Sequence, residues 1–228
     1  MTHAIIVAAG SGSRLGADRP KALVDVGGAP LVAWSVRAFA ECRSIVVAAP
    51  PGHEEDIAHA LEGLRLPPTT VVTGGATRQH SVGRALDRVP ADARRILVHD
   101  AARPLVTPRL IRSVVDALAD EDGAIAASPV ADTLKRADGS GIVEETVDRA
   151  GLWRAETPQG FRAEVMRRVF AEADDALLTR STDCASMVER AGHRIRLVDS
   201  VTPNIKVTTA ADAVVVAALL RIAPEGDA

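Results

Sequence analysis

Aromatic residues are almost missing from this sequence of 228 residues: they make up 2% of it, and there is no tyrosine. Proteins that hold single-stranded nucleic acid stack its bases on aromatic side chains, and this chain has no such platform. Positive charge is not in excess either, because the formal net charge is -3 at pH 7. Binding to a nucleic-acid backbone depends on an excess of lysine and arginine. We therefore expect no nucleic-acid partner.

Cysteines and long apolar runs are also scarce. The two cysteines, Cys42 and Cys184, show neither the spacing of metal ligands nor a disulfide framework. No apolar run reaches the ~20 residues that cross a bilayer, and residues 1–7 lack the basic region and the apolar stretch of a signal peptide. Hydrophobic residues nevertheless make up 47% of the chain, enough for a sizeable core. We expect a cytoplasmic protein with no membrane partner and a single domain over residues 1–228.

Lysine is rare even among the basic residues, because 24 of them are arginine and only three are lysine. A lysine ammonium is a compact charge on a flexible stem, and arginine does not replace it at every phosphate. Lys21 and Lys206 each lie in a predicted loop beside the end of a strand or helix. We expect these two lysines at a functional site, whereas chance explains Lys135 equally well.

Six apolar runs alternate with helical patterns along the chain. They are rich in valine, isoleucine, leucine and alanine, as strands buried on both faces are. The predicted strands are residues 3–8, 44–49, 69–73, 95–99, 124–128 and 194–199. Helices are predicted over 30–42 and 77–89, and capping patterns at Thr107 and Thr209 open two more. This order predicts an α/β fold, with a doubly wound, Rossmann-like, mostly parallel sheet.

One segment interrupts the alternation. Residues 130–136 and 142–147 resemble two strands joined by a glycine turn at 137–141. Both strands are too polar to be buried on two faces. We predict a protruding β-hairpin within about residues 130–152, which is either a surface hairpin or a dimerisation arm that grips a second subunit.

A glycine-rich segment follows the first predicted strand. Residues 8–21 read Ala-Ala-Gly-Ser-Gly-Ser-Arg-Leu-Gly-Ala-Asp-Arg-Pro-Lys. Glycines allow backbone N–H groups to close around an anion, and Arg14 and Lys21 add fixed positive charge. The segment therefore predicts a binding site for a nucleoside triphosphate. An ordinary strand-to-helix turn with surface charges is the alternative.

The spacing of this segment differs from the two best-known phosphate loops. Gly10 and Gly12 match the start of a dinucleotide fingerprint, but Leu15 stands where the third glycine belongs. A Walker loop requires a glycine directly before its lysine, and Lys21 follows Pro20. The segment therefore indicates a different class of nucleotide-binding enzyme.

Polar residues follow two more of the predicted strands. In open α/β sheets, ligands bind beyond the carboxyl ends of the strands. Gly74 and Gly75 would let a base or a sugar approach the backbone closely. Asp100 is a hard oxygen ligand placed where Mg²⁺ could join it to a triphosphate, although it could instead cap the following turn. His99 has the position of a structural histidine, and we do not include it in the site.

The same motifs, and several later ones, carry a family resemblance. Besides 8–14 and Pro20-Lys21 they are Gly74-Gly75 with Arg78 and Ser81, Val98-His99-Asp100-Ala101-Ala102-Arg103, Asp132-Thr133-Leu134-Lys135, Val147-Asp148-Arg149-Ala150-Gly151-Leu152-Trp153, Thr157-Pro158-Gln159, Thr182-Asp183 and Asn204-Ile205-Lys206-Val207. Over nearly its whole length the chain resembles the 2-C-methyl-D-erythritol 4-phosphate cytidylyltransferases of isoprenoid biosynthesis. The motifs at 147–153 and 204–207 are more specific than the first two, which many sugar-nucleotide transferases share.

The resemblance implies a role for each matching residue. The implied catalytic residues are Arg14, Lys21, Arg149 and Lys206. The implied nucleotide-binding residues are Ala8, Ala9, Gly10, Gly12, Gly75, Ser81, Asp100 and Ala101. The implied acceptor-binding residues are Arg103, Thr133, Arg149, Thr157 and Lys206. Mg²⁺, or another divalent cation, would be held at Asp100, and the hairpin would reach across a homodimer to bring Thr133 and Arg149 to the neighbouring site.

The implied reaction transfers a cytidylyl group from CTP to 2-C-methyl-D-erythritol 4-phosphate and releases pyrophosphate. Val7, Ala22 and Pro203 depart from residues common in the family, but none of them removes a charged group from the site. The nearest alternative is a cytidylyltransferase for another alcohol phosphate, such as ribitol 5-phosphate. An NAD-dependent dehydrogenase is disfavoured by the missing third glycine, and a regulator without turnover by the number of convergent cations.

Overall fold

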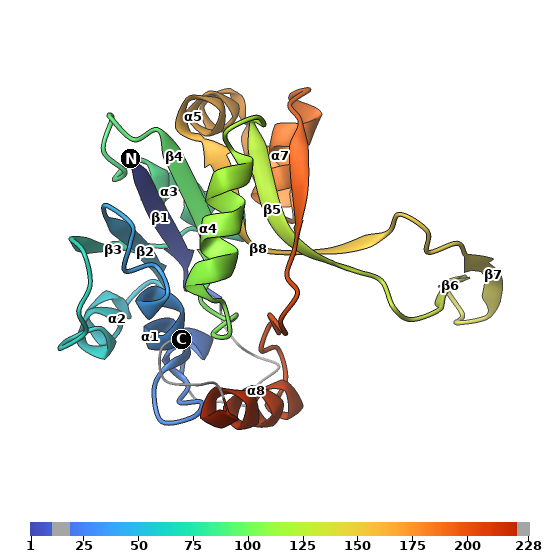
Figure 1. Cartoon of the computed structure of the whole chain (residues 1–228), viewed down its shortest axis with the longest axis horizontal. Coiled ribbons are helices and arrows are strands. Elements are labelled where there is room, and N and C mark those ends of the chain that lie inside the picture. Colours follow the sequence, from blue (N-terminus) through green and yellow to red (C-terminus); the bar gives the residue numbers. More distant parts are fainter. Residues whose placement is uncertain (11–18, 223–228) are drawn as a thin grey trace.

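The computed structural model describes residues 1–10 and 19–222, and these form a seven-stranded sheet with helices on both faces (Figure 1). The strand order is β3-β2-β1-β4-β8-β5-β9. The strands are β1 (Thr2–Val7), β2 (Ile45–Ala49), β3 (Thr69–Thr73), β4 (Arg95–Asp100), β5 (Gly123–Pro129), β8 (Trp153–Arg162) and β9 (Ile195–Asp199). All six predicted strands are present, with ends shifted by one residue or so. The α/β fold class and the mostly parallel sheet are confirmed.

Strand β8 is the part of the sheet that the sequence pattern did not reveal. It pairs antiparallel with both β4 and β5, while the other strand pairs of this sheet are parallel. Its sequence carries Glu156, Thr157 and Gln159 among its buried residues. Such a polar segment does not match the apolar pattern of a central strand, because its polar groups find their partners on elements far away in the sequence.

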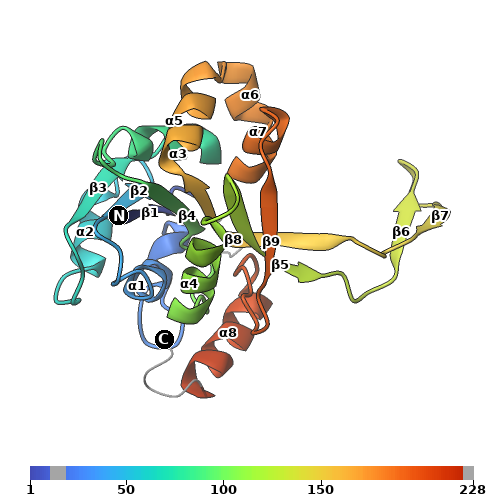
Figure 2. The same ribbon diagram turned by 45° about the horizontal axis from the view of Figure 1, so that its top comes forward.

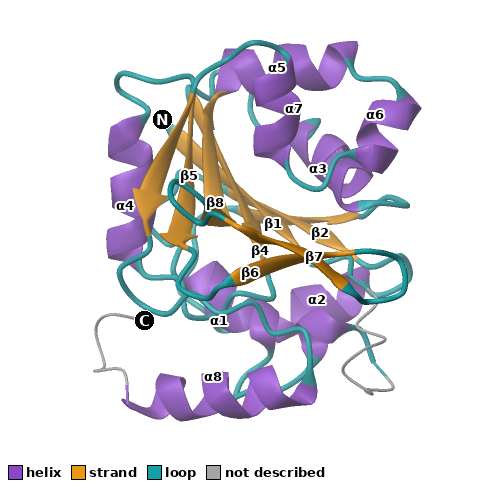
Figure 3. Cartoon of the chain, turned by 90° about the vertical axis from the view of Figure 1, so that its right-hand side faces the viewer, coloured by secondary structure: helices purple, strands orange, loops and turns teal. Residues whose placement is uncertain are grey.

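The alternation of side chains along the strands builds two cores. Ala4 and Ile6 of β1 belong to one core, and Ile5 between them belongs to the other. The first core lies under α1 (Leu31–Arg37), α2 (Glu54–Ala60) and α4 (Pro108–Ala117). The second lies under α3 (Arg78–Leu86), α5 (Ala163–Glu172) and α7 (Cys184–Arg190). Figure 3 shows α4 and the α3, α5 and α7 group on opposite sides of the sheet.

The last described helix, α8 (Ala210–Ile222), packs against Val26, which follows the short helix η2 (Lys21–Leu23), and against Leu31 at the start of α1. Its predicted capping box is confirmed. The Asp212 carboxylate accepts from the Thr209 N–H at 2.8 Å, and the Thr209 hydroxyl oxygen accepts from the Asp212 N–H at 3.2 Å. The Val207 N–H also donates to the Ala102 carbonyl at 2.8 Å. These contacts fix the chain directly after Lys206.

The predicted hairpin is confirmed as an arm that leaves the body between β5 and β8. Its strands β6 (Leu134–Ala137) and β7 (Val143–Val147) pair antiparallel and form a separate sheet. Figures 1 and 2 show the arm extending well beyond the body, which consists of the seven-stranded sheet and its helices. Its turn is closed by Asp138, whose carboxylate accepts from the Ser140 and Ile142 N–H groups.

The remaining helix, α6 (Asp175–Arg180), lies against α3. Within residues 1–10 and 19–222, no helix is long and apolar enough to cross a membrane.

Candidate active site

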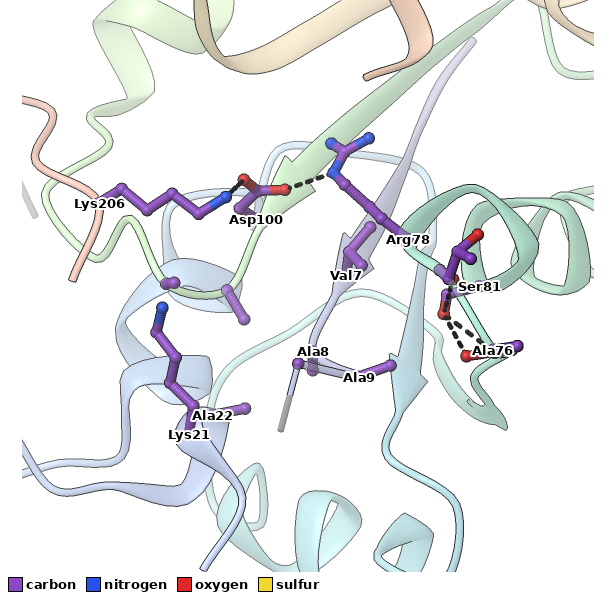
Figure 4. A pocket seen from close by; sticks show the side chains of 15 residues that line it. Val7, Ala8, Ala9, Lys21, Ala22, Ala76, Arg78, Ser81, Asp100 and Lys206 are labelled. Atoms are coloured by element: carbon purple, nitrogen blue, oxygen red, sulfur yellow. Dashed lines mark hydrogen bonds and ion pairs between the residues drawn. The ribbon is translucent and has the colours of Figure 1, made fainter. Parts of the chain in front are cut away.

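A cavity of about 370 Å³ opens where β1 and β4 end (Figure 4). Parallel strands end at the same edge of a sheet, so Val7 of β1 and Asp100 of β4 lie side by side there. Lys21 enters from η2, Arg78 from the first turn of α3, and Lys206 from the segment before α8. Residues far apart in the chain therefore form one pocket wall.

Most of the predicted catalytic and nucleotide-binding residues line this cavity. They are Ala8, Ala9, Gly10, Lys21, Gly75, Ser81, Asp100, Ala101 and Lys206. Gly12 and Arg14 lie outside the described residues. The two lysines expected at a functional site, Lys21 and Lys206, both line this cavity, whereas Lys135 lies on the arm and donates to the Thr146 hydroxyl.

Asp100 is the electrostatic centre of the site. One carboxylate oxygen accepts from Arg78 Nε at 2.9 Å, and the other accepts from Lys206 Nζ at 2.8 Å (Figure 4). Burial by itself would raise the pKa of Asp100, but the charges of Arg78 and Lys206 outweigh it and hold the pKa well below its ordinary value. Asp100 is therefore a carboxylate at any pH at which the protein works.

Arg78 is a site residue that the sequence analysis placed in a motif without a role. Its Nε donates to Asp100, its Nη1 lies 3.4 Å from Gln79 Oε1, and its Nη2 is buried without a partner among the described residues. A buried guanidinium donor that lacks an acceptor, in the wall of a cavity, suits an oxygen of a ligand. The sequence does contain a pattern that could have identified it. Arg78 directly follows the helix cap Thr77, and the glycine turn at Gly74 and Gly75 precedes that cap.

The charge of the cavity is positive overall. Among the described residues that line it, Lys21, Arg78 and Lys206 surround one carboxylate, Asp100. Cavity walls of low dielectric strengthen the attraction of such a cluster for an anion. The cavity therefore suits a polyanion such as a triphosphate.

The turn between β3 and α3 forms the wall opposite Lys21. An added Cβ at Gly74 would lie 2.5 Å from Ala9 Cβ, and one at Gly75 would lie 2.3 Å from His80 Cβ. Larger residues therefore do not fit at either position. The Ser81 hydroxyl accepts from the Gly75 N–H at 3.0 Å and donates to the Thr77 carbonyl at 2.9 Å. Ser81 thus holds the turn in place, as a surface for a flat base requires.

Two further cavities adjoin the first. One, of about 180 Å³, shares Arg78, Asp100 and Lys206 with it and adds Thr157. The other, of about 570 Å³, shares Lys206 and adds Arg103. The predicted acceptor residues Arg103, Thr157 and Lys206 therefore lie together. Arg103 Nη1 donates to the Asn204 carbonyl at 2.7 Å, which ties it to the segment that carries Lys206.

The other two predicted acceptor residues lie elsewhere. Thr133 and Arg149 are exposed on the arm, and Arg149 donates to the Ala131 carbonyl. They line none of the three cavities described above. Figures 1 and 2 show the arm directed away from the body, so these residues do not join Lys206 within one chain.

His99, which the sequence analysis leaves out of the site, is held by contacts within the protein. The ring is buried, packs on Phe39, and forms hydrogen bonds with the Thr157 hydroxyl at 2.9 Å and the Arg103 carbonyl at 3.1 Å. Burial lowers its pKa to about 3. His99 is thus a neutral structural residue that supports the turn after β4.

Asp100 can also be tested as a ligand for Mg²⁺. Both oxygens accept hydrogen bonds, but each carboxylate oxygen has a second lone pair that could coordinate a metal. The described residues contain no cluster of three or more metal-ligating side chains. Mg²⁺ in nucleotide sites usually takes one or two carboxylates and completes its shell from phosphates and water. The residues fit an ion of that kind, bound together with a triphosphate.

The cavity is cationic and lies at the carboxyl edge of a doubly wound sheet, where α/β enzymes bind nucleotides. These features place the chain in the class of nucleotide-binding α/β enzymes. The model of one family, 2-C-methyl-D-erythritol 4-phosphate cytidylyltransferase, matches residues 2–222. A protein of that name from a Synechococcus species is 44% identical over 225 residues, which cover 96% of this chain and 98% of the relative. The chain belongs to this family of nucleotidyltransferases, and the resemblance seen in the motifs is confirmed.

Solved structures agree with this assignment. The 2-C-methyl-D-erythritol 4-phosphate cytidylyltransferase of Thermus thermophilus is 32% identical, with a TM-score of 0.79 over 97% of this chain and 100% of that one. The 4-diphosphocytidyl-2C-methyl-D-erythritol synthase of Anaerococcus prevotii is 26% identical, with a TM-score of 0.82 over 96% of this chain and 98% of that one. The fold is therefore that of the family.

Proposed function

We propose that this chain transfers the cytidylyl group of CTP to 2-C-methyl-D-erythritol 4-phosphate, which yields 4-diphosphocytidyl-2-C-methyl-D-erythritol and pyrophosphate. The observation that supports it most directly is the meeting of Lys21, Asp100 and Lys206 in one cavity. The first lysine comes from the glycine-rich segment that follows β1, and the second comes from the family's most distant motif. An enzyme that joins a triphosphate to a second phosphate requires cations from both sides.

The chemistry explains why so many cations are needed. A phosphate oxygen of the acceptor attacks the α-phosphorus of CTP in line, the bond to the β-phosphate oxygen breaks, and pyrophosphate leaves. Two unit charges of like sign at ~4 Å repel by about 4 kcal/mol at an effective dielectric constant of 20. Charge neutralisation and alignment are the main requirements of such transfers.

Each cation of the cavity has a place in this scheme. Lys21 would neutralise the triphosphate together with Arg14. Lys206 would hold the phosphate of the acceptor, and because an ammonium has three N–H donors it can do so while it remains bonded to Asp100. Arg78 would keep Asp100 in place and offer its unpartnered Nη2 to a ligand oxygen. Gly75 and the backbone held by Ser81 would contact the base.

A divalent cation, Mg²⁺ by its chemistry, would bind Asp100 and the triphosphate and would withdraw charge from the phosphate oxygens. Through its two hydrogen bonds, Asp100 would hold Lys206 and Arg78 in orientations that face the bound phosphates.

The arm suggests a homodimer. We infer that Thr133 and Arg149 of a second copy complete the acceptor site, since in their own chain they lie on the protruding arm. A cytoplasmic location stays a prediction, as the water-soluble substrates suggest.

The decisive measurement is CTP-dependent release of pyrophosphate with 2-C-methyl-D-erythritol 4-phosphate as acceptor. Ribitol 5-phosphate serves as the matched competitor, because it offers the same phosphate on a different polyol. We expect turnover with the first acceptor and little with the second. The reverse preference, or no pyrophosphate with either, would contradict the proposal.

A further inference from the structure

Glu156 is a buried carboxylate for which the proposed reaction has no use. It lies on β8 with 7% of its surface exposed. No lysine or arginine among the described residues lies within ion-pair distance of it. Instead, its Oε1 accepts from the Ser128 hydroxyl at 2.7 Å and its Oε2 accepts from the Ser200 hydroxyl at 2.8 Å. The Arg103 guanidinium adds an attraction at longer range. Because a buried carboxylate is costly to leave without hydrogen bonds, the bonds from the two serines are both needed.

The two serines lead to different parts of the molecule. Ser128 stands near the end of β5, where the chain departs for the arm, and its hydroxyl oxygen also accepts from Arg154 Nη2 at 2.9 Å. Ser200 follows β9 and opens the segment 200–206, which ends at Lys206. Glu156 therefore joins the base of the arm to the start of the lysine segment.

The backbone of the segment 200–206 requires outside support. Val201 has a φ of 33°, a conformation that β-branched residues rarely adopt. Its side chain is 83% exposed, so its own packing cannot impose this conformation. A residue of this kind persists only where neighbouring contacts determine the backbone. The contacts on its N-terminal side include the Val201 N–H to the Asp199 carboxylate at 3.0 Å, the Ser200 N–H to the Ala127 carbonyl at 2.9 Å and the Ser200 hydroxyl to Glu156.

Further along, the segment is fixed by a second set of contacts. Asn204 Nδ2 donates to the Thr157 carbonyl at 2.7 Å, and Arg103 Nη1 donates to the Asn204 carbonyl. Lys206 then reaches Asp100. Two adjacent residues of β8, Glu156 and Thr157, thus anchor the segment at its start and near its end. A shift at the first anchor changes the direction in which the chain approaches the second.

We propose that Glu156 is a positioning residue which acts through Ser200 to place Lys206 in the active-site cavity. Its effect on the reaction rests on the proposed function, while its effect on the position of Lys206 does not. Two carboxylate oxygens oblige both hydroxyls to donate toward Glu156, whereas an amide in its place would present one N–H₂ group, from which one serine would have to accept instead of donating. The carboxylate therefore holds both branches in one arrangement.

The test compares the two branches of the same carboxylate. Ser200→Ala breaks the branch toward Lys206, and Ser128→Ala is the matched control because it removes the same group from the other oxygen. Loss of one hydrogen bond to a buried charge corresponds to about a tenfold fall in kcat/KM if it is expressed fully at the active site. We expect a fall of that size for Ser200→Ala and Glu156→Gln, and a much smaller one for Ser128→Ala.

A readout without turnover follows from the small number of lysines. Reductive methylation with ¹³C-formaldehyde labels three lysine side chains and the N-terminus, and a Lys206→Arg variant assigns the Lys206 signal. In Ser200→Ala and Glu156→Gln the Lys206 resonance should move, while those of Lys21 and Lys135 should not. Thermal melting of each variant establishes that it is folded.

The outcomes separate the two proposals. If the wild type releases no pyrophosphate but the Lys206 signal still moves in Ser200→Ala, the function is wrong and the positioning role stands. If the wild type is active and folded Ser200→Ala and Glu156→Gln leave both kcat/KM and the Lys206 signal unchanged, the positioning role is overturned. Equal losses in Ser128→Ala and Ser200→Ala would also overturn it, because they would indicate a general structural role. Glu156→Gln should cause no additional loss in a chain that already carries Lys206→Ala.

Discussion

The cavity and the arm are held in opposite ways. Asp100 at the cavity is buried and lies between two cations, and the turn at Gly75 has no room for a Cβ. On the arm, Ile142 and Val143 are 67% and 57% exposed. Its strands rely on their own backbone pairing and on surface pairs such as Arg136 with Glu145. Contacts between distant parts of one chain therefore shape the cavity, whereas the two strands of the arm are held by contacts with each other.

The sharpest test of this contrast compares two lysines. Lys21→Ala removes a cation from the cavity, and we expect kcat to fall by ~10²–10³, the usual effect of losing one group that stabilises the transition-state charge. Lys135→Ala is the matched control on the arm, where the ammonium donates to the neighbouring Thr146 hydroxyl. Steady-state rates of pyrophosphate release measure both. Near-normal turnover of Lys21→Ala in a folded protein would remove Lys21 from the mechanism.

A second test asks whether the arm contributes to an active site, in which case the cavity and the arm would not be functionally separate. Arg149→Ala and Lys21→Ala chains should each be nearly inactive alone. If the arm serves the partner, mixed dimers should regain activity, because one of their two composite sites contains no substitution. Subunit exchange is verified with two different affinity tags before the assay. Absence of recovery in verified mixed dimers would argue that Arg149 acts within its own chain or not at all.

Glycine positions provide the third test. Gly75→Ala places a Cβ 2.3 Å from His80 Cβ, so the turn must shift. We expect the KM for CTP to rise about tenfold, which corresponds to ~1.4 kcal/mol, within the range for overpacking of a tight site. Gly139→Ala on the arm is the control, because no atom lies within 4 Å of the added Cβ. An unchanged KM for CTP in Gly75→Ala would mean that this turn does not contact the nucleotide.

The smallest expected effect concerns stability in acid. The pKa of Asp100 is lower in the folded chain than its unfolded value of about 3.9, so the carboxylate stabilises the fold above that pH. This contribution is lost progressively as the pH falls below about 4 toward the folded pKa. Asp100→Asn should therefore cost about 1–3 kcal/mol at neutral pH, as expected for a broken buried hydrogen-bonded charge. Urea unfolding at pH 7 and pH 3 measures the free energy of unfolding of both proteins. The difference between Asp100→Asn and the wild type should be smaller at pH 3 than at pH 7.

If the difference in the free energy of unfolding were the same at pH 7 and pH 3, the ionisation of Asp100 would not be what stabilises the folded chain. Asp116→Asn, on the exposed side of α4, is the control and should follow the wild type at both pH values.

Short-range patterns in the sequence were sufficient for most of the fold. Apolar runs identified six strands of the sheet, because a strand buried on both faces is apolar throughout. The capping box at Thr209 and the helix cap at Thr107 depend on residues three positions apart, and both are confirmed. The strand ends then located Asp100, since ligands of such sheets bind at that edge.

Strand β8, Arg78 and Glu156 required the folded chain. β8 is polar because Thr157 bonds Asp100 and Glu156 bonds Ser128 and Ser200, and no local pattern records partners 28 to 57 residues away. The pairing of Arg78 with Asp100 depends likewise on the crossing of α3 over the sheet. From residue types and their spacing, the sequence by itself determines which strands, helix caps and chemical groups the chain contains. Which groups meet, and in which charge state, follows from long-range packing and burial.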